Sequence, residues 1–133
     1  MNDSQKQTVQ WFPGHMAKTR RLIKESLPFV DLVTEIVDAR IPMSSSNPEL
    51  KEMIGNKPRI VLLNKCDVAD EKTTARWVEY YRNMGVNALP VDCRTGKGLN
   101  AYLPLVRRVL KDKIKRNEEK GMVGKPLRVM VVG

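Results

Sequence analysis

The sequence lacks several features that define other classes of protein. No apolar run is longer than about five residues, so no segment is long enough for a membrane-spanning helix. Two cysteines and a single histidine cannot supply the four ligands of a structural zinc site. The first ten residues are polar and contain no arginine, unlike a secretory signal or a mitochondrial presequence. We therefore expect a cytoplasmic protein with free thiols and with no membrane partner.

Basic residues clearly outnumber acidic ones. The chain carries 24 Lys and Arg against 15 Asp and Glu, a formal net charge of +9. This imbalance favours a polyanionic partner such as RNA, because neutralisation of phosphates drives association. The charge is concentrated in residues 18–24 and 107–116, which are candidates for RNA contact. Both segments could equally be solvated helix faces, and DNA is not a predicted partner.

Strand patterns alternate with helix patterns along the chain. Runs rich in Val, Ile and Leu predict four strands, at residues 31–39, 59–64, 86–91 and 127–132. Helical spacing of apolar residues, with capping and breaking residues, predicts helices at 16–26, 48–54, 71–84 and 99–114. Asn47 and Asp70 are the expected N-caps, and residues 40–46 an expected loop. The alternation predicts one α/β domain over residues 1–133, with a parallel sheet flanked by helices.

Asn64, Lys65, Cys66 and Asp67 form an N-K-x-D element directly after the apolar run I-V-L-L. Ligands of open α/β sheets bind beyond the carboxyl ends of the strands, where this element lies. The Asp67 carboxylate can accept two hydrogen bonds from guanine, at N1–H and the exocyclic amine, and adenine offers neither donor there. Asn64 would tie the loop to neighbouring segments, and the Lys65 stem would cover one face of the base. The element therefore predicts guanine binding by Asn64, Lys65 and Asp67.

A second polar loop, from Asp92 to Gly98, follows the next predicted strand. GTPases carry an S-A-K-type loop at this place, in which a backbone N–H at the alanine position meets the guanine oxygen. This chain has Asp, Cys and Arg at the three positions, and a backbone contact tolerates the Cys replacement best. Cys93, with Arg94 beside it, is therefore the expected second contact with guanine. A plain polar turn is the alternative interpretation of the same residues.

The sequence ends with L-R-V-M-V-V-G, an apolar run that leads into Gly133. A strand that runs into glycine is how a phosphate-binding loop begins. In an ordinary GTPase the phosphate loop precedes N-K-x-D, whereas here the order is reversed. The order therefore predicts the N-terminal part of a circularly permuted P-loop GTPase domain, which stops where its phosphate loop begins.

Further blocks of the sequence match one family over nearly the whole chain. They are W-F-P-G-H-M-A-K at 11–18, D-A-R-I-P-M-S-S at 38–45, Asn47-Pro48, K-P-R-I-V-L-L-N-K at 57–65 and the final apolar run. On these blocks the chain resembles the ribosome biogenesis GTPase A family, permuted GTPases that help to mature the large ribosomal subunit. The first two blocks are the most specific, and a mitochondrial branch shares them.

The resemblance implies a Ras-like fold, binding of GTP and GDP with Mg²⁺, and hydrolysis stimulated by the ribosomal particle. The implied partner is a precursor of the large ribosomal subunit, contacted through its rRNA. Groups that hold Mg²⁺ and the β- and γ-phosphates are expected downstream of residue 133. These 133 residues alone are therefore expected to lack GTPase activity.

The resemblance also implies a catalytic role for His15, since these proteins lack the water-positioning glutamine of Ras. An imidazole could orient the attacking water, because phosphoryl transfer depends mainly on positioning and charge stabilisation. A histidine that only closes the Pro13-Gly14 turn is the alternative. The residues suggest no chemical role for Asp38 or Arg40, and Asp38 is expected to brace its own loop.

Two other functions stay open from the sequence. One is a non-enzymatic basic α/β module that binds RNA, in which N-K-x-D is coincidental. The other is a permuted GTPase with a different partner. A downstream G-K-S/T element followed by D-x-x-G would separate the GTPase from the RNA-binding module.

Overall fold

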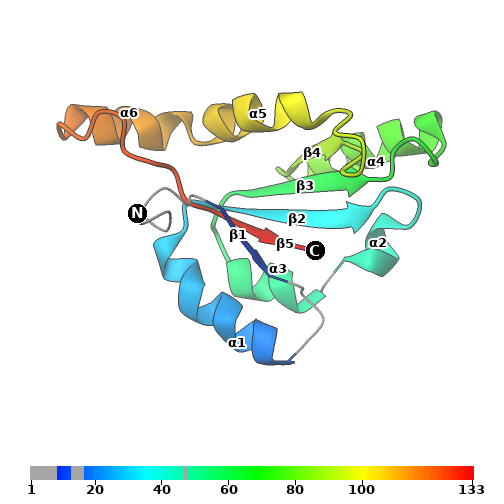
Figure 1. Cartoon of the computed structure of the whole chain (residues 1–133), viewed down its shortest axis with the longest axis horizontal. Helices are drawn as coiled ribbons and strands as arrows, with labels where there is room; N and C mark the ends of the chain where they lie inside the picture. The colour runs from blue at the N-terminus through cyan, green and yellow to red at the C-terminus, as the bar shows by residue number, and fades with distance from the viewer. Residues whose placement is uncertain (1–8, 13–16, 47) are drawn as a thin grey trace.

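Five parallel strands form one sheet in the order β1-β5-β2-β3-β4 (Figure 1). The computed structural model describes residues 9–12, 17–46 and 48–133. The strands are β1 (Val9–Phe12), β2 (Leu32–Asp38), β3 (Arg59–Asn64), β4 (Asn87–Pro90) and β5 (Val129–Val132). The predicted α/β class and parallel sheet are confirmed, and all four predicted strands are present.

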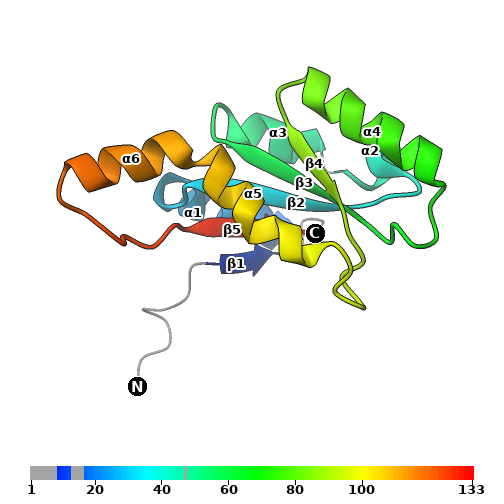
Figure 2. The ribbon, with the colours of Figure 1, turned by 90° about the horizontal axis from the view of Figure 1, so that it is seen from above.

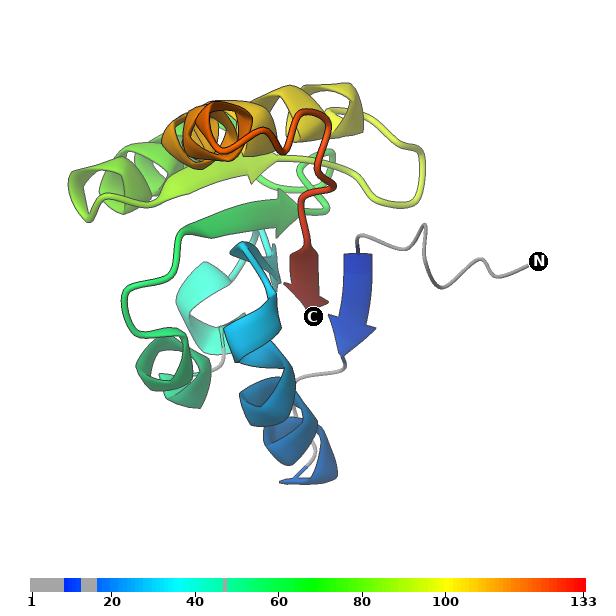
Figure 3. The same cartoon turned by 90° about the vertical axis from the view of Figure 1, so that its left-hand side faces the viewer.

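The strand β1 was not predicted. It pairs in parallel with β5, from Val9 opposite Val129 to Phe12 opposite Val132. Val9, Trp11 and Phe12 are strand-forming residue types, but four residues are too few to show a periodic pattern, and the pairing partner lies far away in the sequence. Only the folded sheet brings β1 and β5 side by side (Figure 3).

Helices cover both faces of the sheet. They are α1 (Ala17–Ser26), α2 (Pro42–Ser45), α3 (Pro48–Ile54), α4 (Glu71–Asn83), α5 (Tyr102–Val109) and α6 (Lys111–Glu119). Two 3₁₀ turns, η2 (Leu27–Phe29) and η3 (Leu99–Ala101), join neighbouring elements. In Figures 1 and 3, α1 and α3 lie on one side of the sheet and α5 on the other. In the part of the chain that the structure describes, no helix has the length and apolar character needed to cross a membrane.

The two faces of β2 show how the core is built. Side chains alternate between the faces of a strand. Accordingly, Val33 packs in a cluster with Ile23 of α1 and Leu50 of α3. Leu32, one residue earlier, belongs to a second cluster with Leu105 of α5. Because both faces are buried, the central strands read as nearly continuous apolar runs rather than as alternating ones.

Two predicted segments differ from the structure. The predicted loop 40–46 contains the single turn α2, and the predicted helix 99–114 is η3, α5 and α6, with a break at Leu110. Leu110 is buried against the sheet, whereas α6 has no buried residue among those described. Figure 2 shows α6 extending beyond the strands. The helix therefore changes direction where its support by the sheet ends.

Of the two predicted N-caps, Asp70 lies in the described part of the chain and Asn47 does not. Asp70 caps α4, because its carboxylate accepts a hydrogen bond from the backbone N–H of Thr73. Asn47 lies outside the described residues, so its capping role stays a prediction.

Candidate functional site

The carboxyl ends of the strands bring the predicted site residues to one edge of the sheet. Asp38 at the end of β2 is the register partner of Asn64 at the end of β3. Leu63 of β3 pairs with Pro90 of β4, so the N-K-x-D loop and the loop 92–98 begin side by side. Gly133 follows β5 at the same edge. This is the edge at which open α/β sheets bind ligands.

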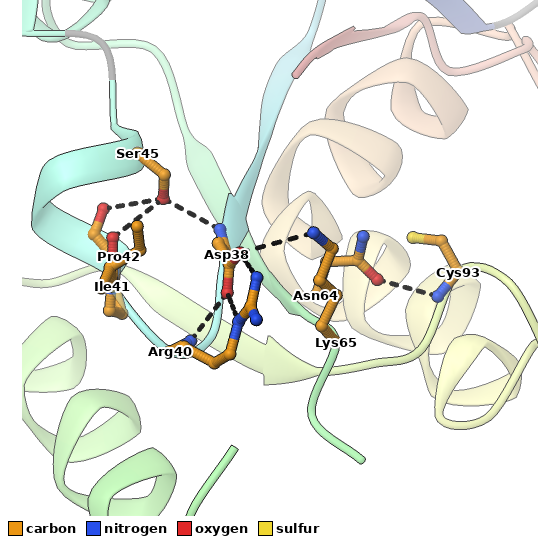
Figure 4. A network of polar contacts seen from close by, with 8 residues as sticks. All are labelled: Asp38, Arg40, Ile41, Pro42, Ser45, Asn64, Lys65 and Cys93. Carbon is orange, nitrogen blue, oxygen red and sulfur yellow. Dashed lines mark hydrogen bonds and ion pairs between the residues drawn. The ribbon is translucent and has the colours of Figure 1, made fainter. Parts of the chain in front are cut away.

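Backbone and amide groups tie the loops after β3 and β4 together. The Asn64 side-chain Oδ1 accepts a hydrogen bond of 2.9 Å from the backbone N–H of Cys93. In the other direction, the N–H of Cys66 donates to the carbonyl of Val91 at 3.1 Å. The prediction that Asn64 ties its loop to a neighbouring segment is therefore confirmed (Figure 4).

Lys65 has an unusual backbone conformation. Its φ is +65°, and it is the sole non-glycine residue with a positive φ among those described. L-residues adopt this left-handed region at a cost of about 1 kcal/mol or more. The cost indicates that the surrounding contacts hold Lys65 in place.

Asp67 presents an accessible carboxylate. Its side chain is 35% exposed and lies 4.0 Å from Nη2 of Arg94, whose side chain is 83% exposed. An ion pair this exposed contributes about 1 kcal/mol at most, so a ligand can displace Arg94 at little cost. Asp67 can therefore accept the two hydrogen bonds that a guanine edge offers.

The loop 92–98 is organised around Asp92. This buried carboxylate accepts hydrogen bonds from the Thr95 hydroxyl at 2.8 Å and from the backbone N–H of Arg94 at 3.0 Å. These bonds, with the Thr95 hydroxyl as the main cause, hold the pKa of Asp92 below its ordinary value. The polar turn considered from the sequence is therefore present, and Asp92 is the residue that builds it.

The predicted contact between Cys93 and guanine is affected by a hydrogen bond that the sequence does not show. Its backbone N–H, the expected donor to the guanine oxygen, already donates to Asn64. A guanine contact at Cys93 therefore requires that Asn64 share or release this donor. Partial burial raises the pKa of the Cys93 thiol, and both it and Cys66 are free thiols. The guanine contact of Cys93 stays a prediction.

Asp38 links the D-A-R-I-P loop to the N-K-x-D loop (Figure 4). Its carboxylate accepts from Arg40 Nε at 3.0 Å, from Arg40 Nη2 at 2.7 Å and from the Arg40 N–H at 2.9 Å. Lys65 Nζ lies 3.5 Å from the same carboxylate. Chiefly because of the Arg40 hydrogen bond, the pKa of Asp38 is well below its ordinary value. Asp38 braces its loop, as predicted, and its link to Lys65 is an additional finding.

A buried carboxylate in the centre of β2 was not predicted from the sequence. Glu35 is 3% exposed, and its Oε2 accepts a hydrogen bond of 2.9 Å from the Ser46 hydroxyl. Its Oε1 lies 3.9 Å from Nη1 of Arg59. The signal was available, because an acidic residue inside an otherwise apolar strand must be paired when it is buried. Glu35 fixes the end of the loop that Asp38 begins.

His15 and Gly133 are the two remaining residues of the predicted site. His15 lies outside the described residues, so the structure does not test its catalytic role. Gly133 directly follows β5, and its role as the start of a phosphate loop stays a prediction. Within the described ranges, no group of three or more His, Cys, Asp or Glu side chains could hold a metal ion.

Comparisons with known proteins identify relatives of this chain. No family model matches the sequence. The chain is 51% identical over 128 residues to the ribosome biogenesis GTPase A of Priestia megaterium, covering 95% of this chain and 44% of that protein. It is 38% identical over 104 residues to the mitochondrial ribosome-associated GTPase 1 of Mus musculus, covering 77% of this chain and 32% of that protein. The chain thus spans less than half the length of these curated relatives.

A solved structure shares the fold. The crystal structure of GNP-bound YlqF from T. maritima matches with a TM-score of 0.54 and 30% sequence identity. The match covers 87% of this chain and 42% of that one. This chain therefore shares its fold with part of that protein.

Proposed function

Because this chain belongs to the ribosome biogenesis GTPase A family, we propose that it carries the guanine-reading part of a GTPase that assembles the large ribosomal subunit. One observation carries the proposal. The N-K-x-D loop after β3 is hydrogen-bonded to the loop after β4, at the sheet edge where Gly133 follows β5. GTP and GDP are the proposed ligands, and bacterial cytoplasm is the proposed location.

Three residues divide the work of reading the base. The accessible carboxylate of Asp67 accepts from N1–H and the exocyclic amine of guanine. The Lys65 stem covers one face of the ring, and Asn64 keeps the two loops together. Arg94 moves from Asp67 to solvent or to the ligand. Adenine would leave the carboxylate without donors, which is the basis of discrimination.

We propose a circularly permuted order, with the phosphate loop beginning at Gly133. In the chain, β5 and Gly133 come after the N-K-x-D loop, although in the sheet β5 lies next to β2. In P-loop proteins, Lys and Ser/Thr groups hold the phosphates and Mg²⁺. We propose that these groups lie in the part of the relatives' sequence that this chain does not span. Mg²⁺, when bound, would neutralise charge on the phosphates.

The proposed catalytic role of His15 is supported by the position of β1. That strand ends at Phe12, whose register partner Val132 directly precedes Gly133. The described part of β1 therefore ends beside the strand that leads to the proposed phosphate loop. His15 follows Phe12 by three residues in the sequence, and we propose that its imidazole orients the attacking water.

Replacement of His15 by alanine is expected to slow hydrolysis about a hundredfold while nucleotide affinity stays unchanged. The test uses this chain extended by the remaining sequence of the Priestia megaterium relative, called below the extended protein. Single-turnover hydrolysis and equilibrium binding of the same variant are compared. Equal losses of binding and turnover would instead identify His15 as a structural residue.

The proposed partner is rRNA of a large-subunit precursor. Exposed basic side chains on α5 and α6 support it, namely Arg107, Arg108, Lys111, Lys115 and Arg116. The projection of α6 beyond the strands makes this surface accessible to a large particle (Figure 2). Phosphate contacts by such a surface would weaken as salt concentration rises.

A fluorescence titration of guanine against adenine nucleotides tests the proposed function directly. The extended protein is expected to bind GDP at least about a hundredfold more tightly than ADP, since a site built around donors on the ligand rejects an analogue that lacks them. The GTPase proposal predicts this preference. Equal affinities for GDP and ADP would contradict the GTPase proposal and leave the basic RNA-binding module as the better interpretation.

A further inference from the structure

We propose that Asp38 positions Lys65 over the guanine base, and that Arg40 competes with Lys65 for the Asp38 carboxylate. The inference rests on the proposed function, because it assigns a role within the same base-reading site. It concerns two residues of the D-A-R-I-P block for which the sequence suggests no chemical role. Four observations in the described residues carry it.

The first observation is the fixed position of Asp38 beside the base-reading loop. Asp38 and Asn64 are register partners at the ends of β2 and β3. The N–H of Ala39 donates to the carbonyl of Asn64 at 2.7 Å, which extends the pairing one step further. The N–H of Asp38 itself donates to the Ser45 hydroxyl at 2.9 Å. The Asp38 backbone is therefore held on both sides, and its carboxylate has a defined place.

The second observation is the conformation of Lys65. A residue at φ +65° is most easily a glycine, so a lysine there needs contacts that compensate for the strain. Its Nζ is directed to Asp38 Oδ2 at 3.5 Å. A lysine side chain loses conformational freedom when it is ordered. An anchor at its far end removes part of that loss before a nucleotide binds, which is preorganisation.

The third observation is that two cations share one oxygen. Asp38 Oδ2 accepts from Arg40 Nη2 at 2.7 Å and also faces Lys65 Nζ at 3.5 Å. Arg40 makes the shorter contact and donates to both carboxylate oxygens, so it is the stronger partner of Asp38. Without Arg40, the carboxylate would be free to pair more closely with Lys65.

The fourth observation is exposure. The Asp38 side chain is 15% exposed, whereas those of Arg40 and Lys65 are about half exposed. The carboxylate therefore belongs to the protein framework, and the two cations can move relative to it. A carboxylate that is fixed in the protein can position a cationic side chain that would otherwise move freely, as the proposed role of Asp38 requires.

The test measures GDP affinity of the extended protein by fluorescence titration. Asp38→Asn is expected to weaken GDP binding about two- to fivefold, as suits one partly exposed ion pair, while the preference for GDP over ADP stays. Arg40→Ala is expected not to weaken binding, because it removes only the competitor. Asp70→Asn is the matched control, since Asp70 caps α4 through Thr73 and an asparagine caps equally well.

A double-mutant cycle separates positioning from bracing. In a Lys65→Met background, which keeps an apolar stem without the charge, Asp38→Asn is expected to have no further effect on GDP affinity. Arg40→Ala and Asp38→Asn weakening binding equally would show that Asp38 only braces its loop, and would overturn the inference. So would an Asp38→Asn effect that persists with Lys65→Met. If GDP is preferred over ADP but Asp38→Asn binds normally, this inference fails and the proposed function stands.

Discussion

Replacement of Asp67 by asparagine is expected to convert a preference for guanine into a preference for xanthine. The amide would face guanine N1–H and the exocyclic amine with its own N–H donors, so at least one pair of donors would oppose each other. Two charge-assisted hydrogen bonds are lost, and guanine affinity should fall about a hundredfold or more. Xanthine carries an oxygen in place of that amine, which an asparagine N–H can meet.

The measurement is a parallel titration of GDP and XDP against the unchanged and Asp67→Asn extended proteins. Asp70→Asn makes the same chemical change only three residues away, at the N-cap of α4. It is expected to leave both affinities unchanged. If Asp67→Asn loses affinity for GDP without gaining affinity for XDP, Asp67 acts on the loop rather than on the base. If it loses neither, Asp67 does not read the base.

Replacement of Gly98 by alanine is expected to destabilise the fold by about 3 kcal/mol. A Cβ at this position would lie 2.5 Å from the carbonyl oxygen of Pro90 and 3.3 Å from Cα of Val91. Both neighbours are backbone atoms at the end of β4, so neither can move aside without displacing the strand. The positive φ of +84° adds strain for any residue with a side chain.

Gly96→Ala is the matched control for Gly98→Ala. Gly96 has the same φ of +84°, but a Cβ added there would meet no atom within 4 Å. It is expected to cost only about 1 kcal/mol, the penalty of the left-handed backbone alone. Urea unfolding of the 133-residue chain gives both values. Equal costs for the two variants would show that the close approach at Pro90 relaxes freely.

The Gly98 contact also bears on the base-reading site. The displaced strand end would carry Val91, whose carbonyl accepts the N–H of Cys66, and Asp92, which builds the following turn. Shifting them would disturb the bond between Cys93 and Asn64. The requirement for glycine at this position therefore connects stability with the geometry of the site.

Local sequence patterns were sufficient to predict the class of fold and the residues that are proposed to read the base. Continuous apolar runs such as I-V-L-L can be satisfied only by burial on both faces, which requires helices on each side of a parallel sheet. N-K-x-D after such a run lies at a strand's carboxyl end in any sheet of this kind, so the edge that carries Asn64, Lys65 and Asp67 followed from local sequence. The N-cap at Asp70 could also be predicted from neighbouring residues, because its partner Thr73 is only three residues away.

The relations between distant segments could not be predicted from local patterns and became visible in the folded chain. The pairing of β1 with β5, the break at Leu110 and the burial of Glu35 all depend on where the sheet ends and what covers it. Asp38 acquires its link to Lys65 through the register of β2 and β3, and the Cys93 N–H is engaged by Asn64 across a loop boundary. A local pattern specifies which residues can bind. Contacts between strands far apart in the chain decide which donors and carboxylates are free to do so.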